Sequence, residues 1–293
     1  MRYCIKQLPY LRWDDGITGG NKVYKKDFKA EALISIKQRI TMASNPPSAC
    51  CAKGLRHEGQ SIGGLESFNG IETYVVGDRT SKKVLYIMTD AIGHKFINLQ
   101  LIADQFAEAG YLVVMPDLFN GDPIALNPPA GFDPFKDWVP KHMPDITKPI
   151  VNKVYDAIVE KYSPKYITSI GYCYGAKYVV HLLGECKVQC GAVCHPSFVT
   201  IEEIKAIKAP IIICGAETDT TYTEELRHQT EAALKEKRLR TSLLLLQVLH
   251  MDSPFVETCR IMLPNSPRKG LSEILLSGSI ALSRGTKRAC LGR

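Results

Sequence analysis

The sequence has no apolar run of about 18 residues, the length that a membrane-crossing helix needs. It does not open with the apolar segment of a secretory signal, and it has no Cys-x-x-Cys pair of the kind that binds zinc. These absences argue against a membrane protein, a secreted protein and a zinc protein. We therefore expect a cytoplasmic protein whose ten cysteines are reduced thiols, without a metal and without a membrane partner.

The net charge of +7 and the hydrophobic content of 45% describe a moderately basic chain with enough apolar residues for a core. Much of the positive excess lies at the two ends, and residues 1–41 carry nine Lys or Arg against four Asp or Glu. A basic end is more often a solvated tail than a nucleic-acid-binding arm. We therefore expect no nucleic-acid partner.

The sequence pattern divides the chain into three segments. Residues 1–41 show no sustained period, which predicts a disordered extension, and Met42 offers an alternative start. Residues 42–255 carry the regular pattern of one domain. Residues 256–293 form an atypical tail rich in Ser, Arg and Lys. The pattern leaves the oligomeric state open.

From about Gly70 onward, short apolar runs alternate with segments of helical spacing. The runs that predict strands are 71–77, 84–90, 111–117, 166–173, 190–196, 209–219 and 241–250. Helical spacing covers 99–110, 146–162 and 225–237. The alternation indicates an α/β fold with a mainly parallel, doubly wound sheet and helices on both faces. Active sites in such sheets lie at the carboxyl ends of the strands.

The segment Gly171-Tyr172-Cys173-Tyr174-Gly175 lies where a predicted strand runs into a helical pattern. It is the G-x-C-x-G form of the nucleophile elbow of α/β-hydrolases, with cysteine where most of them have serine. Glycines are needed there because strand and helix pass closely at a strained nucleophile. The helix N-terminus favours the thiolate of Cys173, and the backbone N–H of Tyr174 would face an oxyanion. The alternative is a buried structural cysteine flanked by chance glycines.

A nucleophile needs a base, and the base needs an acid to orient it. In α/β-hydrolases the chain order is nucleophile, acid, histidine, which selects Asp219 after one predicted strand and His250 at the end of the next. Asp252 is a rival for the acid. The rivals for the base are His181, His195 and His228. His195 ends a strand and would line a cleft, whereas His228 falls within a helix and is expected to be solvated.

Asp90 and Ala91 follow an upstream predicted strand. α/β-Hydrolases supply the second amide of the oxyanion hole from this position, so we expect the N–H of Ala91 to act together with that of Tyr174. A carboxylate at Asp90 is able to hold or accept the proton of the thiol.

Longer segments of the chain resemble the dienelactone hydrolase family, especially its fungal members. They lie between Cys50 and Glu236 and read CCAKGLRHEG, FNGIETYVVG, TDAIGHKFINLQLIADQFAEAGYLVVMPDLFNGDP, SIGYCYGAKY, CHPSFV and AETDTTYTEELR. The resemblance implies an α/β-hydrolase fold, a Cys-Asp-His triad, no cofactor, and hydrolysis of small esters or lactones such as dienelactone. It assigns Cys173 as the nucleophile and Asp219 as the orienting acid. It also places Asp90 where the family has an acidic residue that controls the proton of the thiol.

One segment departs from the family pattern. The histidine of the family lies in a segment like GVxHGFAVRG, followed by a closing helix, whereas this chain reads QVLHMDSPFVETC around His250. The genetic code allows a second reading of this segment in a shifted frame. If each new codon joins the last base of one codon to the first two bases of the next, the stretch from Gln247 to Thr258 is able to encode Gly-Val-Ala-His-Gly-Phe-Ala-Val-Arg-Gly-Asp. Our hypothesis is a shift of reading frame near Arg240, which sequencing of the transcript tests. The chain as written is then at risk of losing activity, stability or both.

Two other functions stay open at this point. The altered C-terminal region favours a non-catalytic α/β-hydrolase-like protein that binds a small ligand or a partner, and the number of cysteines favours a thiol redox sensor. Ester hydrolysis measured beside alkylation of Cys173 separates them. The natural substrate cannot be read from the sequence, although we expect the loop 132–143 to shape its pocket.

Overall fold

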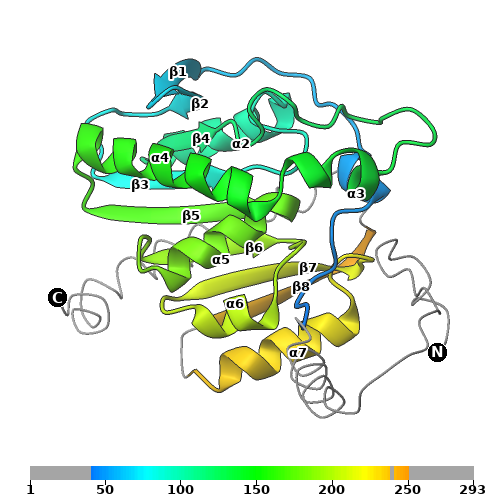
Figure 1. Cartoon of the computed structure of the whole chain (residues 1–293). Helices are drawn as coiled ribbons and strands as arrows, with labels where there is room; N and C mark the ends of the chain where they lie inside the picture. Colours follow the sequence, from blue (N-terminus) through cyan, green and yellow to red (C-terminus); the bar gives the residue numbers. More distant parts are fainter. Residues whose placement is uncertain (1–40, 238–240, 251–293) are drawn as a thin grey trace, which may run out of the picture. The chain divides into compact units, whose positions relative to one another are not determined.

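A computed structural model of the chain describes residues 41–237 and 241–250, which are drawn in colour in Figure 1. Within them, eight strands form one sheet in the order β1-β2-β4-β3-β5-β6-β7-β8. The pairs β1–β2 and β2–β4 are antiparallel, and every other pair is parallel. The strands are β1 (Gly64–Phe68), β2 (Ile71–Val76), β3 (Lys83–Met88), β4 (Leu112–Pro116), β5 (Tyr166–Tyr172), β6 (Cys190–Cys194), β7 (Ile211–Thr218) and β8 (Thr241–His250).

Helices cover both faces of the sheet (Figure 1). The α-helices are α2 (Ile97–Glu108), α3 (Pro134–Asp137), α4 (Pro144–Tyr162), α5 (Ala176–Gly184), α6 (Ile201–Ala206) and α7 (Glu224–Lys235). Short 3₁₀ helices are η1 (Ala49–Ala52), η2 (Val139–Lys141) and η3 (Cys173–Gly175). None of the helices in this part of the chain is long and apolar enough to cross a membrane.

Two hydrophobic cores lie on opposite faces of the sheet. One contains apolar side chains of α2, such as Leu99 and Phe106, packed with alternate residues of the strands. The other contains apolar side chains of α4, α5, α6 and α7, with Val154 and Leu182 among them. Because both faces are covered, the central strands β4, β5 and β6 are buried almost throughout. The expected doubly wound α/β architecture is confirmed.

The predicted strands and long helices are present, but the sequence reasoning missed shorter elements. Strand β1 forms a hairpin with β2 through Asn69 and Gly70, whose φ angles of 51° and 84° suit the tight turn that an Asn-Gly pair favours. Helix α6 begins with a capping box in which Thr200 and Glu203 bond each other's backbone N–H groups. Both signals were legible in the sequence.

The three-segment division stays a prediction. Residues 1–40, which make up nearly all of the expected extension, and the expected tail 256–293 lie outside the described residues. The described chain begins with a segment that packs into the domain, since Ala43 and Ser44 are fully buried.

Candidate active site

Cys173 occupies the sharp turn between β5 and α5, at the carboxyl end of a central strand. Its φ angle is +47°, in the left-handed region that residues other than glycine seldom adopt. The side chain is fully buried. A strained nucleophile at a strand-to-helix turn is the geometry expected of the elbow, and it argues against an ordinary cysteine within a strand.

The two flanking glycines are required by close backbone contacts. A Cβ at Gly171 would lie 2.8 Å from Cα of Ala176, and a Cβ at Gly175 would lie 2.4 Å from the carbonyl oxygen of Met88. Distances below 3.0 Å are not seen for real Cβ atoms, and backbone atoms cannot move aside cheaply. The predicted steric reason for G-x-C-x-G is therefore present in the fold.

The side chain that contacts the sulfur is Ser197, which the sequence reasoning did not select. The Oγ atom of Ser197 lies 3.6 Å from Sγ of Cys173, and the backbone N–H of Ser197 donates to the carbonyl of Cys173 at 3.1 Å. Ser197 follows the carboxyl end of β6, beside β5. Two signals in the sequence could have pointed to it: its position after a strand end, and the segment CHPSFV, which resembles the family and contains it.

Asp90 lies just beyond the carboxyl end of β3, the strand that neighbours β5. Its carboxylate is buried, and Oδ1 accepts the backbone N–H groups of Ile92 at 2.9 Å and Gly93 at 3.4 Å. Burial raises the pKa of Asp90 to about 6, although these N–H groups and His195 oppose the rise. Among the described residues its carboxylate makes no hydrogen bond to Cys173.

The expected oxyanion-hole residues come from adjacent strand ends. In the register of β3 and β5, Met88 pairs with Gly171, so the turn containing Ala91 follows β3 beside the elbow that contains Tyr174. The close approach of Gly175 to the backbone of Met88 and Thr89 places the two segments against each other. The assignment of their backbone amides to an oxyanion hole stays a proposal.

The side chain of Tyr174 anchors the elbow to the segment before α4. Its hydroxyl donates to the carbonyl of His142 and bonds Oγ1 of Thr147 at 2.9 Å. Its ring packs edge-on against Trp138, with centroids 5.3 Å apart. Thus the loop 132–143, which we expected to shape the pocket, is tied directly to the residue after Cys173, the candidate nucleophile.

Asp219 follows the end of β7 and is held in place by the next turn. Its Oδ1 accepts the N–H and the hydroxyl of Thr221, at 2.8 and 2.9 Å, and the N–H of Tyr222 at 2.8 Å. Its Oδ2 is buried and has no hydrogen-bond partner among the described residues. One oxygen is fixed while the other is left to receive a donor, which suits an acid that orients a histidine.

His250 is the last residue of β8, and its backbone pairs with Thr218, immediately before Asp219. The main chain thus carries His250 to the strand end where the candidate acid lies. Its side chain lies outside the described part of the structure, as does all of Asp252. Both assignments stay predictions.

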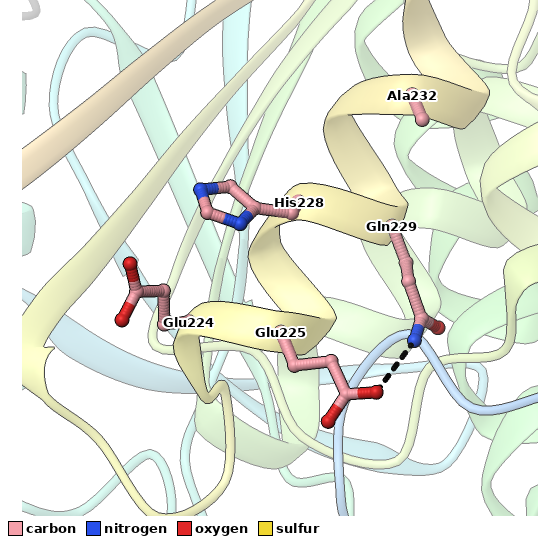
Figure 2. A pocket seen from close by; sticks show the side chains of 5 residues that line it. All are labelled: Glu224, Glu225, His228, Gln229 and Ala232. Carbon is pink, nitrogen blue, oxygen red and sulfur yellow. Dashed lines mark hydrogen bonds between the residues drawn. The ribbon is translucent and has the colours of Figure 1, made fainter.

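The rival histidines have different surroundings. His181 bonds Glu203 at 2.6 Å within an ion pair that also includes Lys177. His228 is exposed on α7, in a surface hollow lined by Glu224, Glu225, Gln229 and Ala232 (Figure 2). His195, half-buried after β6, interacts with the charge of Asp90. Of the three, His195 is the one that lies beside the candidate site.

The mainly parallel sheet and its strained cysteine at a strand-to-helix turn define an α/β-hydrolase. Residues 71–248, more than half of the chain, match the model of the Dienelactone hydrolase family. The chain therefore belongs to the dienelactone hydrolase family of hydrolases.

Curated relatives agree with this assignment, and a solved structure shows the same fold. The hydrolase tropI of Talaromyces stipitatus is 42% identical over 204 residues, which cover 67% of this chain and 80% of the relative. Dienlactone hydrolase 1 of Gibberella moniliformis is 30% identical, over 75% of this chain and 87% of the relative. A crystal structure of a putative dienelactone hydrolase from Klebsiella pneumoniae has a TM-score of 0.56 at 14% identity, covering 77% of this chain and 98% of the other. That structure shows the shared fold.

Proposed function

We propose that this chain hydrolyses small carboxylic esters or lactones by nucleophilic catalysis through Cys173. The observation that carries the proposal is the cysteine itself, held at φ +47° on a strand-to-helix turn whose neighbouring glycines cannot carry a side chain. A buried cysteine with only a packing role does not need such a conformation. Nothing in the described residues favours binding without catalysis.

In the proposed reaction, the thiolate of Cys173 attacks the carbonyl carbon of the ester and forms a carbon–sulfur bond. The negative charge moves to the carbonyl oxygen, where the N–H groups of Ala91 and Tyr174 stabilise it. The carbon–oxygen bond of the ester then breaks, and the departing alkoxide takes up the proton that the thiol of Cys173 gave up, so that it leaves as an alcohol. Water attacks the thioester, releasing the carboxylic acid and returning the thiol.

Asp219 and His250 complete the proposed triad. The fixed Oδ1 of Asp219 supports a role in orienting an imidazole, as does its buried Oδ2, which has no hydrogen-bond partner within the described part of the chain. The pairing of His250 with Thr218 supports His250 as the base that takes the proton of the attacking water. His195 is the alternative base, because it is near enough to Asp90 for its charge to lower the pKa of that carboxyl.

Asp90 is proposed to exchange a proton within the site. Its pKa of about 6 lies close to neutral pH, so its carboxyl group is able to accept and return a proton during turnover.

Hydrolysis of p-nitrophenyl acetate by purified variants tests the proposal. Cys173→Ala is expected to abolish turnover, and His250→Ala to reduce it by at least about 100-fold, the usual effect of losing a general base. The matched control is Cys190→Ala, since Cys190 is a buried thiol within β6 whose pKa burial raises to about 12. This control is expected to keep wild-type turnover.

A rate of ester hydrolysis by Cys173→Ala equal to that of wild type would refute the proposal. Activity that survives His250→Ala but is lost in His195→Ala would move the role of base to His195. Far-ultraviolet circular dichroism of each variant separates lost chemistry from lost fold.

A further inference from the structure

The loop from His195 to Val199 connects β6 to α6 and turns back onto the nucleophile elbow. Ser197 lies at the middle of this loop and is fully buried. Its Oγ lies 3.6 Å from the sulfur of Cys173, and its N–H bonds the carbonyl of the same residue at 3.1 Å. Two contacts, one from the side chain and one from the backbone, thus fix Ser197 against Cys173.

The backbone on both sides of Ser197 is strained. His195 has φ +38° and Phe198 has φ +63°, although neither residue is glycine. The strain is held by neighbouring segments, because the N–H of His195 donates to the carbonyl of Cys214 and that of Phe198 donates to the carbonyl of Asn45, both at 2.8 Å. Left-handed residues maintained in this way gather at functional sites.

A buried ion pair holds the same loop from the other side. Lys177, four residues after the nucleophile, donates from Nζ to the carbonyl of Phe198 at 2.8 Å and to Oε1 of Glu203 at 2.6 Å. Burial alone would raise the pKa of Glu203, but His181, Lys177 and the N–H of Thr200 lower it to about 2. The helix that begins at the elbow therefore also fixes the loop that faces the sulfur.

We infer that Ser197 is a further catalytic residue, whose hydroxyl donates a hydrogen bond to the thiolate of Cys173 and holds the sulfur ready for attack. This assignment rests on the proposed function. In the thiol form the S–H group donates to Oγ of Ser197, and after loss of the proton the hydroxyl donates to the sulfur. Within the described chain, Ser197 supplies the side-chain hydrogen bond that reaches this sulfur. A hydrogen bond to the charged form favours that form.

The direct test is the pH titration of the Cys173 thiolate by its ultraviolet absorbance, in the full-length chain. From the absorbance of each protein we subtract the absorbance of the same protein carrying Cys173→Ala, which removes the contribution of the other cysteines. In Ser197→Ala we expect about ten-fold less thiolate at a fixed pH below the midpoint, because hydrogen bonds to charged groups are the stronger ones. We also expect kcat for p-nitrophenyl acetate to fall about ten-fold while KM stays unchanged.

Ser169→Ala is the matched control. Ser169 is a fully buried serine of β5 whose hydroxyl donates to the carbonyl of Tyr86 at 2.7 Å. Its loss removes a hydrogen bond of the same kind without touching the sulfur, so the thiolate titration is expected to stay where it is. Should Ser197→Ala fail to fold, Ser197→Gly also removes the hydroxyl without adding a second thiol, and its titration is read against Ser197→Gly/Cys173→Ala.

An unchanged titration in a folded Ser197 variant overturns the inference, even if the chain hydrolyses esters through Cys173. Conversely, a shifted titration in a protein whose hydrolysis survives Cys173→Ala refutes the proposed function and, with it, the catalytic role of Ser197. The thiolate titration therefore tests the role of Ser197, and the turnover of Cys173→Ala tests the proposed function, so that either hypothesis can be refuted separately.

Discussion

Replacing Asp90 by asparagine should stabilise the protein at neutral and alkaline pH. Burial raises the pKa of Asp90 from 3.8 to about 6. The folded protein thus binds the carboxyl proton of Asp90 more tightly than the unfolded chain does. The protonated carboxyl therefore adds to the free energy of unfolding, fully below pH 3.8, and this contribution is lost as pH rises through about 6. At 1.36 kcal/mol per unit, the shift corresponds to about 3 kcal/mol. The asparagine side chain does not titrate and keeps an oxygen that can accept from Ile92 and Gly93.

The assay is reversible urea unfolding of wild type and Asp90→Asn, with a thiol reductant, from about pH 4 to about pH 8. The free energy of unfolding of the variant, relative to wild type, should rise by about 2.4 kcal/mol across this range, somewhat less than the full value of about 3 kcal/mol because pH 4 lies just above the unfolded pKa. Asp78→Asn is the control, because Asp78 is exposed and its hydrogen bonds to Thr80 lower its pKa. It should show no such rise. A difference between Asp90→Asn and wild type that is flat with pH would refute the reasoning about burial.

Two further substitutions test the supports of the site. Gly175→Ala should destabilise the fold by about 3 kcal/mol in urea unfolding, because the new Cβ would lie 2.4 Å from the carbonyl oxygen of Met88. Gly64→Ala is the control and should be neutral, because a Cβ there meets nothing within 4 Å. Equal effects would contradict the steric account of the elbow. Lys177→Met should cost roughly 3 kcal/mol, the lower end for a broken buried pair, because Glu203 loses its lysine and keeps only His181 and the N–H of Thr200. Lys235→Met, which breaks an exposed pair, should leave the melting temperature unchanged. Similar melting temperatures for these two variants would show that the buried pair is not needed.

The sequence predicted those parts of the fold and the candidate site that depend on local pattern. Alternating apolar runs and helical spacing gave the parallel sheet, and the order of elements along the chain placed Cys173, Asp90 and Asp219 at strand ends. The glycines of the elbow could be interpreted in advance because G-x-C-x-G at a strand-to-helix turn is a local motif, and the contact that excludes a side chain at Gly171 lies within five residues. The contact that excludes one at Gly175 comes from Met88 on a neighbouring strand and needed the structure.

Ser197 and the anchoring of Tyr174 could not be predicted because they depend on contacts between distant segments. Ser197 reaches the sulfur only because the loop after β6 is bent at His195 and Phe198 and held by Asn45. Tyr174 has the spacing of an ordinary core aromatic, and its bond to the carbonyl of His142 depends on how the preceding loop folds. A serine or a tyrosine has no sequence period that reveals such a partner.

Trapping of the acyl-enzyme tests the central claim most directly. The full-length chain is mixed with excess p-nitrophenyl acetate, quenched in acid during turnover, digested and mapped by mass spectrometry. The account predicts an acetyl group on the peptide that contains Cys173, released by hydroxylamine as a thioester should be, and missing in Cys173→Ala. Turnover with no acyl group on Cys173, or with the acyl group on another residue, would contradict it.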